Sequence, residues 1–433
     1  MLPKEQNELL TRTGPGTPMG ELMRRYWIPA LLSEEIPAPD SPPVQVRLLG
    51  EELVAFRDSK GRIGLLNEHC AHRGTSLFYG RNEECGLRCI YHGWKYDVDG
   101  NVLDTPAEPP DSDFKTKMHT TAYPTRDAAG VIYAYLGPRE KVPLFPDYEW
   151  HQVPLNQTYV TKALLECSYL QGLEGECDSS HLSLLHQTFT PGPARAVWRL
   201  DPSPRYETED CDFGVRLVAT RNAGPGQQYV RLSSFVMPVF GCVPAGRPPG
   251  ELDGYEIHMY VPFNDTLAWR YDMGFRRQRL VTEDEVHRRK QIGPGYVRLR
   301  NARNHYLQDR EMQKKVNYTG IEDFLNHDAV ATESMGPIYD RSKEHLGVSD
   351  KAVIALRKYL LAAVKTIQAG KEPPHIVRDA KRNHFPHVDC FAELLPADIH
   401  WRKQFDYLTE TAEKENPAGY TPKQKAVSQK AVS

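Results

Sequence analysis

Two short segments decide the fold of this chain of 433 residues: "NEHCAHRGTSL" at residues 67–77 and "CIYHGW" at residues 89–94. Each segment contains one Cys–His pair, with one residue between the partners in the first pair and two in the second. The four residues are Cys70, His72, Cys89 and His92. A disulfide would use both cysteines but would leave both histidines without a role. Two loops that each supply a thiol and an imidazole therefore indicate a metal site.

The spacing of the four residues favours iron over zinc. Structural zinc sites usually combine pairs of the form Cys–x₂₋₄–Cys, whereas each pair here mixes the two residue types and sixteen residues separate His72 from Cys89. A two-iron, two-sulfide cluster of the Rieske kind takes two thiolates on one iron and two imidazoles on the other. The two loops deliver that division, so we predict that they bind such a cluster. Structural zinc is the alternative.

Composition argues against several classes of protein. The formal net charge of −3 gives no reason to expect nucleic acid or an anionic membrane as a partner. The start, "MLPKEQNELL", lacks the basic-then-apolar pattern of a signal peptide. The most apolar helical stretch, residues 353–367, is interrupted by Arg357 and Lys358, so we expect no membrane span. Eight cysteines in so long a chain do not resemble a secreted disulfide framework, and we expect a protein of the reducing cytoplasm.

Turn signals divide the chain into a small β region and a larger mixed region. Residues 44–136 have the pattern of short strands, with hairpin turns at residues 59–61 and 99–100. Beyond a Pro- and Gly-rich crossing at residues 137–150, helical and strand patterns mix. We predict the α+β class, with a small all-β iron–sulfur domain and a larger catalytic domain in which helices cover an antiparallel sheet and carry a mononuclear iron. The predicted units are residues 1–43, an N-terminal segment packing on the catalytic domain; 44–140, the iron–sulfur domain; 141–415, the catalytic domain; and 416–433, a flexible polar tail.

The segment "ECDSSHLSLLH" at residues 176–186 indicates a second metal site. We expect a helix over residues 167–187 that contains His181 and His186, five residues apart, which can meet at one metal if the helix is distorted or ends between them. Two imidazoles and one carboxylate form the facial triad of non-haem Fe(II) oxygenases, which leaves positions open for O₂ and substrate. The alternative is a pair of polar helix histidines without a metal.

The motif CxHRG begins at Cys70, and the motif CxYHGWxY begins at Cys89. Both motifs resemble the Rieske domain of aromatic-ring oxygenases. The resemblance runs over nearly the whole chain and is densest at residues 303–350, which are similar to the large subunit of phthalate dioxygenase and its relatives. It implies two cofactors, a Rieske [2Fe–2S] cluster and a mononuclear Fe(II). It also implies a homotrimer or a stacked-trimer homohexamer, served by a separate NADH-dependent flavin and iron–sulfur reductase.

The resemblance also supplies the third iron ligand. In similar oxygenases the ligand aspartate stands on a helix five residues before a glutamate, and Asp328 with Glu333 matches that pattern. Asp323 is the second candidate, and His327 is expected to be a packed or supporting group. The remaining carboxylates of the same segment are Glu322, Asp340 and Glu344.

Asp178 stands three residues before His181 and is predicted to act as a catalytic residue. A carboxylate there can accept a hydrogen bond from the imidazole and so fix its tautomer and orientation. The resemblance implies more: the matching position bridges an iron-ligand histidine to a Rieske histidine, His92 or His72, of the neighbouring subunit. The alternative is a helix carboxylate that faces solvent.

The resemblance implies an aromatic carboxylate as substrate, such as a phthalate, a chlorobenzoate or a phenoxybenzoate. A buried carboxylate needs a cation, and arginine suits it because its planar fork binds both oxygens. Arg231 is the first candidate because it lies in an alternating strand. Three further candidates are Arg199, Arg205 and Arg221. A Pro-rich loop at residues 246–250 is expected to shape the pocket entrance, which leaves a substituted benzoate as plausible as phthalate.

The function that the resemblance implies is that of a terminal oxygenase in aromatic catabolism, which uses O₂ and electrons from NADH to cis-dihydroxylate an aromatic carboxylate. A monooxygenase or O-demethylase of an aromatic acid is an alternative, because the metal ligands are shared. An alternative of another class is a Rieske electron carrier without catalytic iron, against which the pair His181 and His186 argues.

Overall fold

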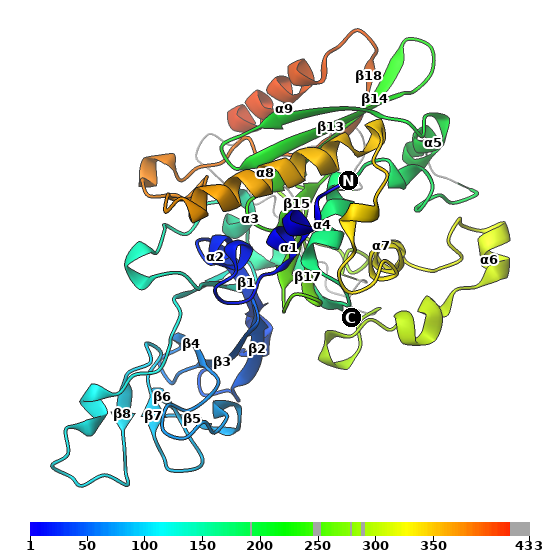
Figure 1. Cartoon of the computed structure of the whole chain (residues 1–433). Helices are drawn as coiled ribbons and strands as arrows, with labels where there is room; N and C mark the ends of the chain where they lie inside the picture. Colours follow the sequence, from blue (N-terminus) through cyan, green and yellow to red (C-terminus); the bar gives the residue numbers. More distant parts are fainter. Residues whose placement is uncertain (191–192, 246–252, 278, 287–290, 416–433) are drawn as a thin grey trace, which may run out of the picture.

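A small β region projects from a larger body in the computed structural model (Figure 1). The structure describes residues 1–190, 193–245, 253–277, 279–286 and 291–415. The predicted loop at 246–250 and the predicted tail at 416–433 lie outside these residues. Within them the α+β class is confirmed, with an all-β unit beside a unit that combines a long antiparallel sheet and helices.

The β region is built from short antiparallel strands in three small sheets. Glycines at the two predicted hairpin turns adopt positive φ, +78° at Gly61 and +85° at Gly100, which confirms both turns. The strands, sheet by sheet, are β1 (Trp27–Leu32), β10 (Val131–Tyr135) and β9 (Thr125–Ala128); β2 (Val44–Leu48), β3 (Glu51–Arg57) and β4 (Ile63–Asn67); and β5 (Arg81–Glu83), β6 (Gly86–Arg88), β7 (Lys95–Tyr96) and β8 (Val102–Asp104).

The larger body contains an antiparallel sheet of eight strands. Strands β15 and β16 are buried along their whole length and β17 nearly so, because helices pack on one side and other segments on the other. In spatial order the strands are β11 (Thr158–Leu165), β17 (Ala268–Phe275), β16 (Glu256–Pro262), β15 (Phe240–Val243), β14 (Gln227–Val236), β13 (Gly214–Asn222) and β12 (Arg205–Asp210), with β18 (Phe391–Pro396) paired to β14.

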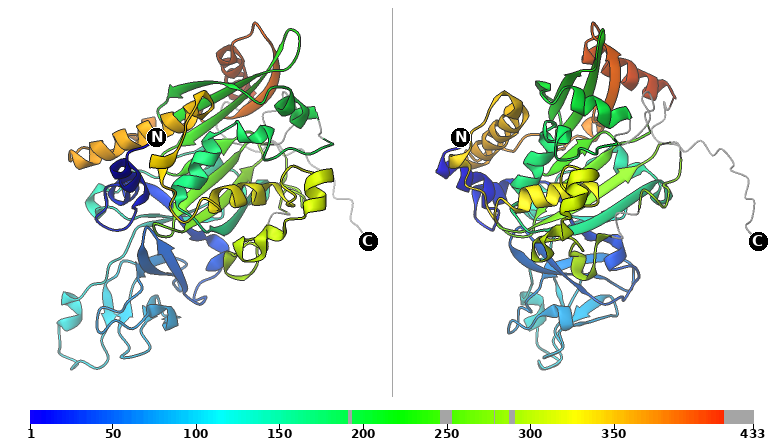
Figure 2. Two further views of the ribbon diagram at one scale, coloured as in Figure 1. Left: turned by 45° about the vertical axis from the view of Figure 1, so that its right-hand side comes forward. Right: turned by 90° about the vertical axis from the view of Figure 1, so that its right-hand side faces the viewer.

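Helices cover this sheet, and Figure 2 shows α4 and α7 lying side by side against it. Helix α4 contacts β14, β15, β16, α7 and α8. None of the helices in the described part of the chain combines the length and apolarity needed to cross a membrane. The helices are α1 (Lys4–Thr11), α2 (Pro18–Met23), α3 (Glu149–Gln152), α4 (Tyr169–Cys177), α5 (Pro193–Leu200), α6 (Arg310–Lys315), α7 (Phe324–Glu333), α8 (Lys351–Gln368) and α9 (Trp401–Glu415).

The N-terminal residues join the two parts of the molecule. Helices α1 and α2 pack on α8 of the larger body, while β1 pairs with β10 in the β region. Ile28 of β1, Ile132 of β10 and Met273 of β17 belong to one continuous hydrophobic core. The predicted domain boundary at residue 44 stays a prediction. The strand at residues 27–32 precedes this boundary in the sequence but pairs with a strand of the β region.

The helix expected over residues 167–187 is shorter in the structure. Helix α4 ends at Cys177, Asp178 is its C-cap in extended conformation, and His181 lies in a separate 3₁₀ turn. The reason is local: the Asp178 carboxylate accepts a hydrogen bond from the backbone N–H of Ser180, an Asx-type turn that competes with the helix. Both histidines therefore lie beyond the helix, on irregular backbone that can bring them together.

Candidate metal centres

The two Cys–His loops of the β region share one hydrogen-bonding pattern. In each loop the backbone N–H of a glycine four residues on, Gly74 or Gly93, donates to the cysteine carbonyl. Both glycines have positive φ, +76° and +75°, which their lack of a Cβ permits. The ring centroids of His72 and His92 lie 4.5 Å apart. The two loops are thus equivalent turns that present two imidazoles side by side.

Cysteines and histidines of these loops differ in exposure. Cys70 and Cys89 are buried, whereas His72 is exposed and His92 half-buried. Tyr96 Oη accepts a hydrogen bond from the Ala71 N–H and lies 3.1 Å from Cys70 Sγ, to which it can donate. The thiol pair therefore sits inside the β region, and the imidazole pair lies at its surface.

The four residues fit a two-iron cluster better than a single ion. One zinc ion would draw its four ligand atoms to within about 4 Å of one another, because Zn–N and Zn–S bonds measure about 2.0–2.3 Å. Among the described residues, the one group of three or more such side chains with ligand atoms all within 4.8 Å lies elsewhere, at His181, His186 and Asp328. The cysteines and histidines of the loops are thus spread more widely, as ligands of two irons are.

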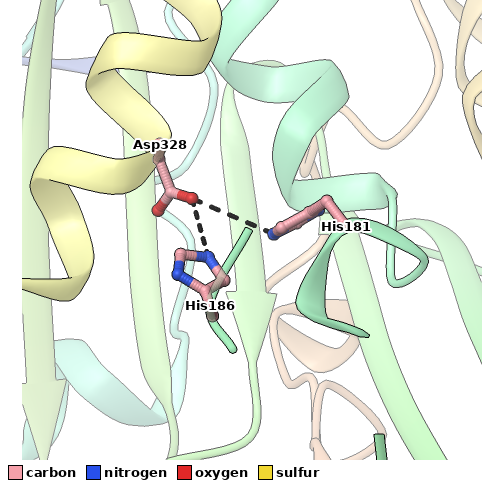
Figure 3. A group of neighbouring side chains, drawn as sticks. All are labelled: His181, His186 and Asp328. Atoms are coloured by element: carbon pink, nitrogen blue, oxygen red, sulfur yellow. Dashed lines mark ion pairs between the residues drawn. The ribbon is translucent and has the colours of Figure 1, made fainter. Parts of the chain in front are cut away.

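The structure brings together His181, His186 and Asp328, the three residues expected to hold the mononuclear iron, with their ligand atoms within 4.8 Å of one another (Figure 3). His186 Nε2 lies 2.9 Å and His181 Nε2 lies 3.9 Å from Asp328 Oδ1. Asp328 comes from α7, across the site from the two histidines. The rival ligand Asp323 caps α7 instead, because its carboxylate accepts from the Leu325 N–H.

Hydrogen bonds fix the protonation of His186. The Nε2 of His327 lies 2.8 Å from the Ile321 carbonyl oxygen, which can only accept, so this nitrogen carries the proton. The Nδ1 of His327 is then an acceptor and receives the Nδ1–H of His186 at 3.2 Å. His186 Nε2 consequently presents a lone pair, and burial lowers the pKa of this imidazole to about 4. His327 is a supporting group, as expected.

A cation fits between His186 and Asp328. The lone pair of His186 Nε2 and the carboxylate Oδ1 of Asp328 are both acceptors, yet they lie 2.9 Å apart. His186 Nε2 is also buried without a hydrogen-bond partner. Burial opposes ionisation of Asp328, but the charge of His186 in its protonated form and that of Arg270 hold the pKa of this carboxyl well below its usual range. The donor set of two imidazoles and one carboxylate suits Fe(II).

Asp178 lies beside His181, in a turn rather than on a helix face. Its Oδ2 lies 3.4 Å from His181 Nδ1, which leaves Nε2 for the metal position. Its Oδ1 accepts hydrogen bonds from the Ser180 N–H and from Tyr206 Oη. Burial raises the pKa of Asp178, but His181 and these donors lower it overall. The carboxylate keeps about a quarter of its surface exposed, at 26%.

The four candidate arginines have different surroundings. Arg199 and Arg205 are exposed, and Arg231 is half-buried on β14. Arg221 is fully buried and donates to the side chain and carbonyl oxygen of Ser179, beside Asp178. Their role in binding substrate stays a prediction.

Sequence reasoning missed three charged residues near the iron ligands: Glu176, His258 and Arg270. Arg270 Nη1 lies 3.5 Å from Asp328 Oδ2, and His258 Nδ1 lies 2.8 Å from Glu176. For His258 and Arg270 the available signal was the presence of two acidic or basic residues in each of the otherwise apolar strands at residues 256–262 and 268–275.

Family models match both parts of the chain. Residues 26–124 match a Rieske [2Fe-2S] domain, and residues 134–426 match a domain described as LigXa C-terminal domain like. The first match begins before β1, so it includes the strand that pairs with β10.

Relatives of known activity align over most of the chain. The phthalate 4,5-dioxygenase oxygenase subunit of Pseudomonas putida is 40% identical, with 93% of this chain and 94% of that protein covered. The 3-chlorobenzoate-3,4-dioxygenase oxygenase subunit of Comamonas testosteroni is 33% identical, with 94% and 98% covered. The 5,5'-dehydrodivanillate O-demethylase oxygenase subunit of a Sphingobium strain is 31% identical, with 88% and 85% covered.

Solved structures share the fold. Dicamba monooxygenase bound to 3,6-dichlorosalicylic acid aligns with a TM-score of 0.58 at 16% identity, covering 81% of this chain and 99% of that one. The overall fold of this chain is therefore common to both proteins.

Proposed function

Since this chain belongs to the family of Rieske non-haem iron oxygenases, whose members hold a [2Fe–2S] cluster and a mononuclear iron, we propose that it is the terminal oxygenase of a system that cis-dihydroxylates an aromatic carboxylate. The substrate in this proposal is phthalate or a substituted benzoate such as chlorobenzoate. The observation that carries it is the convergence of His181, His186 and Asp328 in a domain joined to the Rieske unit.

The chain's own residues divide the work between two centres. The four loop residues would hold the cluster, and the three residues of the second centre would hold the iron. When bound, the cluster supplies single electrons and the iron supplies the place where O₂ and substrate meet. Asp178 fixes the tautomer of His181, and His327 fixes the tautomer of His186. The Nε2 atom of each ligand imidazole then faces the metal position with a lone pair.

Electron transfer between the centres is proposed to run between subunits. The sheet β5–β8, which carries the Rieske loops, lies at one end of the molecule, away from α4 and α7 (Figures 1 and 2). His72 is exposed and Asp178 is partly exposed, so each is accessible to another chain. We propose a homotrimer or stacked-trimer hexamer in which Asp178 accepts a hydrogen bond from His92 or His72 of the partner subunit.

The overall reaction balances with one reductant. NADH supplies two electrons through a separate flavin and iron–sulfur reductase, two protons are taken up in total, and both atoms of O₂ enter the ring as hydroxyl groups. The reductase and the cytoplasmic location belong to this proposal.

Recognition of the substrate carboxylate is assigned to arginine. Arg231, half-buried on β14, keeps its place as the first candidate, and the buried Arg221, which donates to Ser179, adds positive charge near Asp178. Both side chains lie on neighbouring strands, where Arg231 stands opposite Ala219 and Arg221 opposite Tyr229. Exposed Arg199 and Arg205 remain weaker candidates for a buried carboxylate.

The rival proposal is monooxygenation, favoured by the 31% identical O-demethylase relative. The iron ligands are the same in both cases, so products must decide. Purified protein with a reductase is incubated with a panel of phthalates, benzoates and methoxybenzoates under ¹⁸O₂. A cis-diol with two labelled atoms supports the proposal, whereas an unlabelled phenol with released formaldehyde, which carries the label until it exchanges with water, supports demethylation.

Metal analysis tests the oxygenase assignment against a bare electron carrier. We expect two cluster irons with labile sulfide and one further iron per chain. Protein with the cluster alone, in which added Fe(II) neither binds nor restores O₂-dependent turnover, would overturn the oxygenase proposal.

A further inference from the structure

The two carboxylate oxygens of Asp328 face different neighbours. Oδ1 approaches the nitrogens of His186 and His181, at 2.9 and 3.9 Å, and so points to the metal position (Figure 3). Oδ2 lies 3.5 Å from Nη1 of Arg270 on β17. One oxygen is therefore turned to the metal position and the other to a buried cation.

Arg270 is held from three sides. Its side chain is 1% exposed, and its Nε donates to Asp272 Oδ1 at 2.8 Å. Its Nη2 lies 3.5 Å from Glu176 Oε1, and its guanidinium carbon lies 5.4 Å from the ring centroid of Tyr260. A planar guanidinium fixed in this way presents Nη1 to Asp328 in one orientation.

Glu176 is itself anchored by side chains of β16. His258 Nδ1 lies 2.8 Å from Glu176 Oε1, and Tyr260 Oη donates to the same oxygen. Burial would lower the pKa of His258, but Glu176 raises it to about 9, so the imidazole is charged at neutral pH. Behind the iron ligand there is thus a connected set of buried charges.

We propose that Arg270 is a positioning residue that occupies Oδ2 of Asp328, so that Asp328 offers only Oδ1 to the iron and one more coordination position stays open. This inference rests on the proposed iron ligands. A carboxylate free of Arg270 would bind through both oxygens and fill a position that O₂ or substrate needs. Glu176, His258 and Asp272 hold Arg270 in place for that purpose.

The test replaces Arg270 by lysine, which keeps the charge but cannot reach Asp272 and Asp328 together. Protein depleted of mononuclear iron but with its cluster intact is titrated with Co(II), whose d–d absorption weakens as its coordination number rises. In Arg270→Lys we expect weaker d–d bands and a Co(II) dissociation constant about three- to tenfold lower, because a second oxygen becomes available. The matched control is Arg277→Lys, a buried guanidinium that pairs with Glu149, and it should match the wild type.

Unchanged bands, or weaker Co(II) binding by folded Arg270→Lys protein, would overturn the inference. A crystal structure of the wild type with Fe(II) provides a measurement that needs no variant. One Asp328 oxygen on the metal supports the inference, and both oxygens on the metal overturn it even if Arg270→Lys does not fold. A wild type that binds no stoichiometric Co(II) would instead overturn the ligand assignment itself, and this inference with it.

Discussion

The two metal centres of this molecule are built in opposite ways. The Rieske loops come from one short stretch of sequence, and their cysteines belong to a separate cluster of only ten buried hydrophobic residues. The iron site joins segments far apart in the sequence and rests on a much larger core and on buried ion pairs. The ligands of the first centre are thus part of the core of their own domain. The second centre lies on a domain that we expect to fold without its metal.

The comparison predicts its largest effect at the cluster. Cys70→Ala should abolish the cluster and unfold the β region locally, because Cys70 and Cys89 are two members of so small a core. EPR of the reduced protein and hydrogen exchange over residues 63–104 measure the two losses. Cys85→Ala, which removes a half-buried thiol between the loops, is the control and should keep both signals. A full Rieske signal in Cys70→Ala would show the ligand assignment to be wrong.

A change at the second centre should remove its metal without unfolding anything. Asp328→Asn should lose the mononuclear iron and turnover, while the cluster spectrum stays as in the wild type. Iron analysis and thermal unfolding measure the outcome. Asp323→Asn is the control, since asparagine caps a helix as well as aspartate does. Unfolding of the catalytic domain in the Asp328→Asn variant would show that this domain also depends on its metal, contrary to the difference proposed between the two centres.

Asp178→Asn tests the connection between the centres. Both metal sites should assemble and the reductase should still reduce the cluster, but cluster reoxidation with substrate and O₂ should slow by about a hundredfold or more. Asparagine keeps the size but lacks the charge that holds the imidazole N–H groups. Single-turnover kinetics on iron-loaded protein measure this rate. Near-normal reoxidation would leave Asp178 as an orienting group for His181 alone.

The smallest effect concerns the buried charges of the catalytic domain. The pKa of His258 is raised from 6.5 to about 9, so its stabilisation is complete below pH 6.5 and is lost as the pH rises through 9. The groups that face it are Glu176 on α4, Glu256 on β16, and Asp272 and Arg270 on β17. We expect the free energy of unfolding of the catalytic domain to fall by about 3 kcal/mol over that interval. Denaturant unfolding from pH 6 to 10 measures it, and a similar loss in His258→Gln would contradict the assignment.

Local patterns were enough to predict the Rieske loops and both hairpin turns, because spacing and turn residues carry that information. They also gave His181 and His186, but the single helix expected around them was wrong, since the Asp178 turn competes with helix formation at residues 178–180. The third ligand, Asp328, came from the family resemblance. No periodicity of the sequence could relate it to a histidine so far away.

The buried ion pairs could not be predicted from the sequence for a different reason. Alternation identifies a strand with one buried face, but β16 and β17 are buried on nearly every residue. In the sequence, His258 and Arg270 therefore look like the polar residues that a half-exposed strand turns to solvent, although both side chains are buried. Only the packing of α4 against β16 brings Glu176 to His258 and reveals the pairing.

The pairing of β1 with β10 has a consequence for the order of assembly. These strands bracket a segment of about 100 residues, and closing so long a flexible loop costs about 4 kcal/mol of chain entropy. A β region already folded around its cluster brings the two strands close before they pair, because β4 contacts β9 near its exit. Cluster insertion should therefore accelerate maturation of the catalytic half, and cells short of iron–sulfur clusters should accumulate chains whose N-terminal strand is still accessible to proteases.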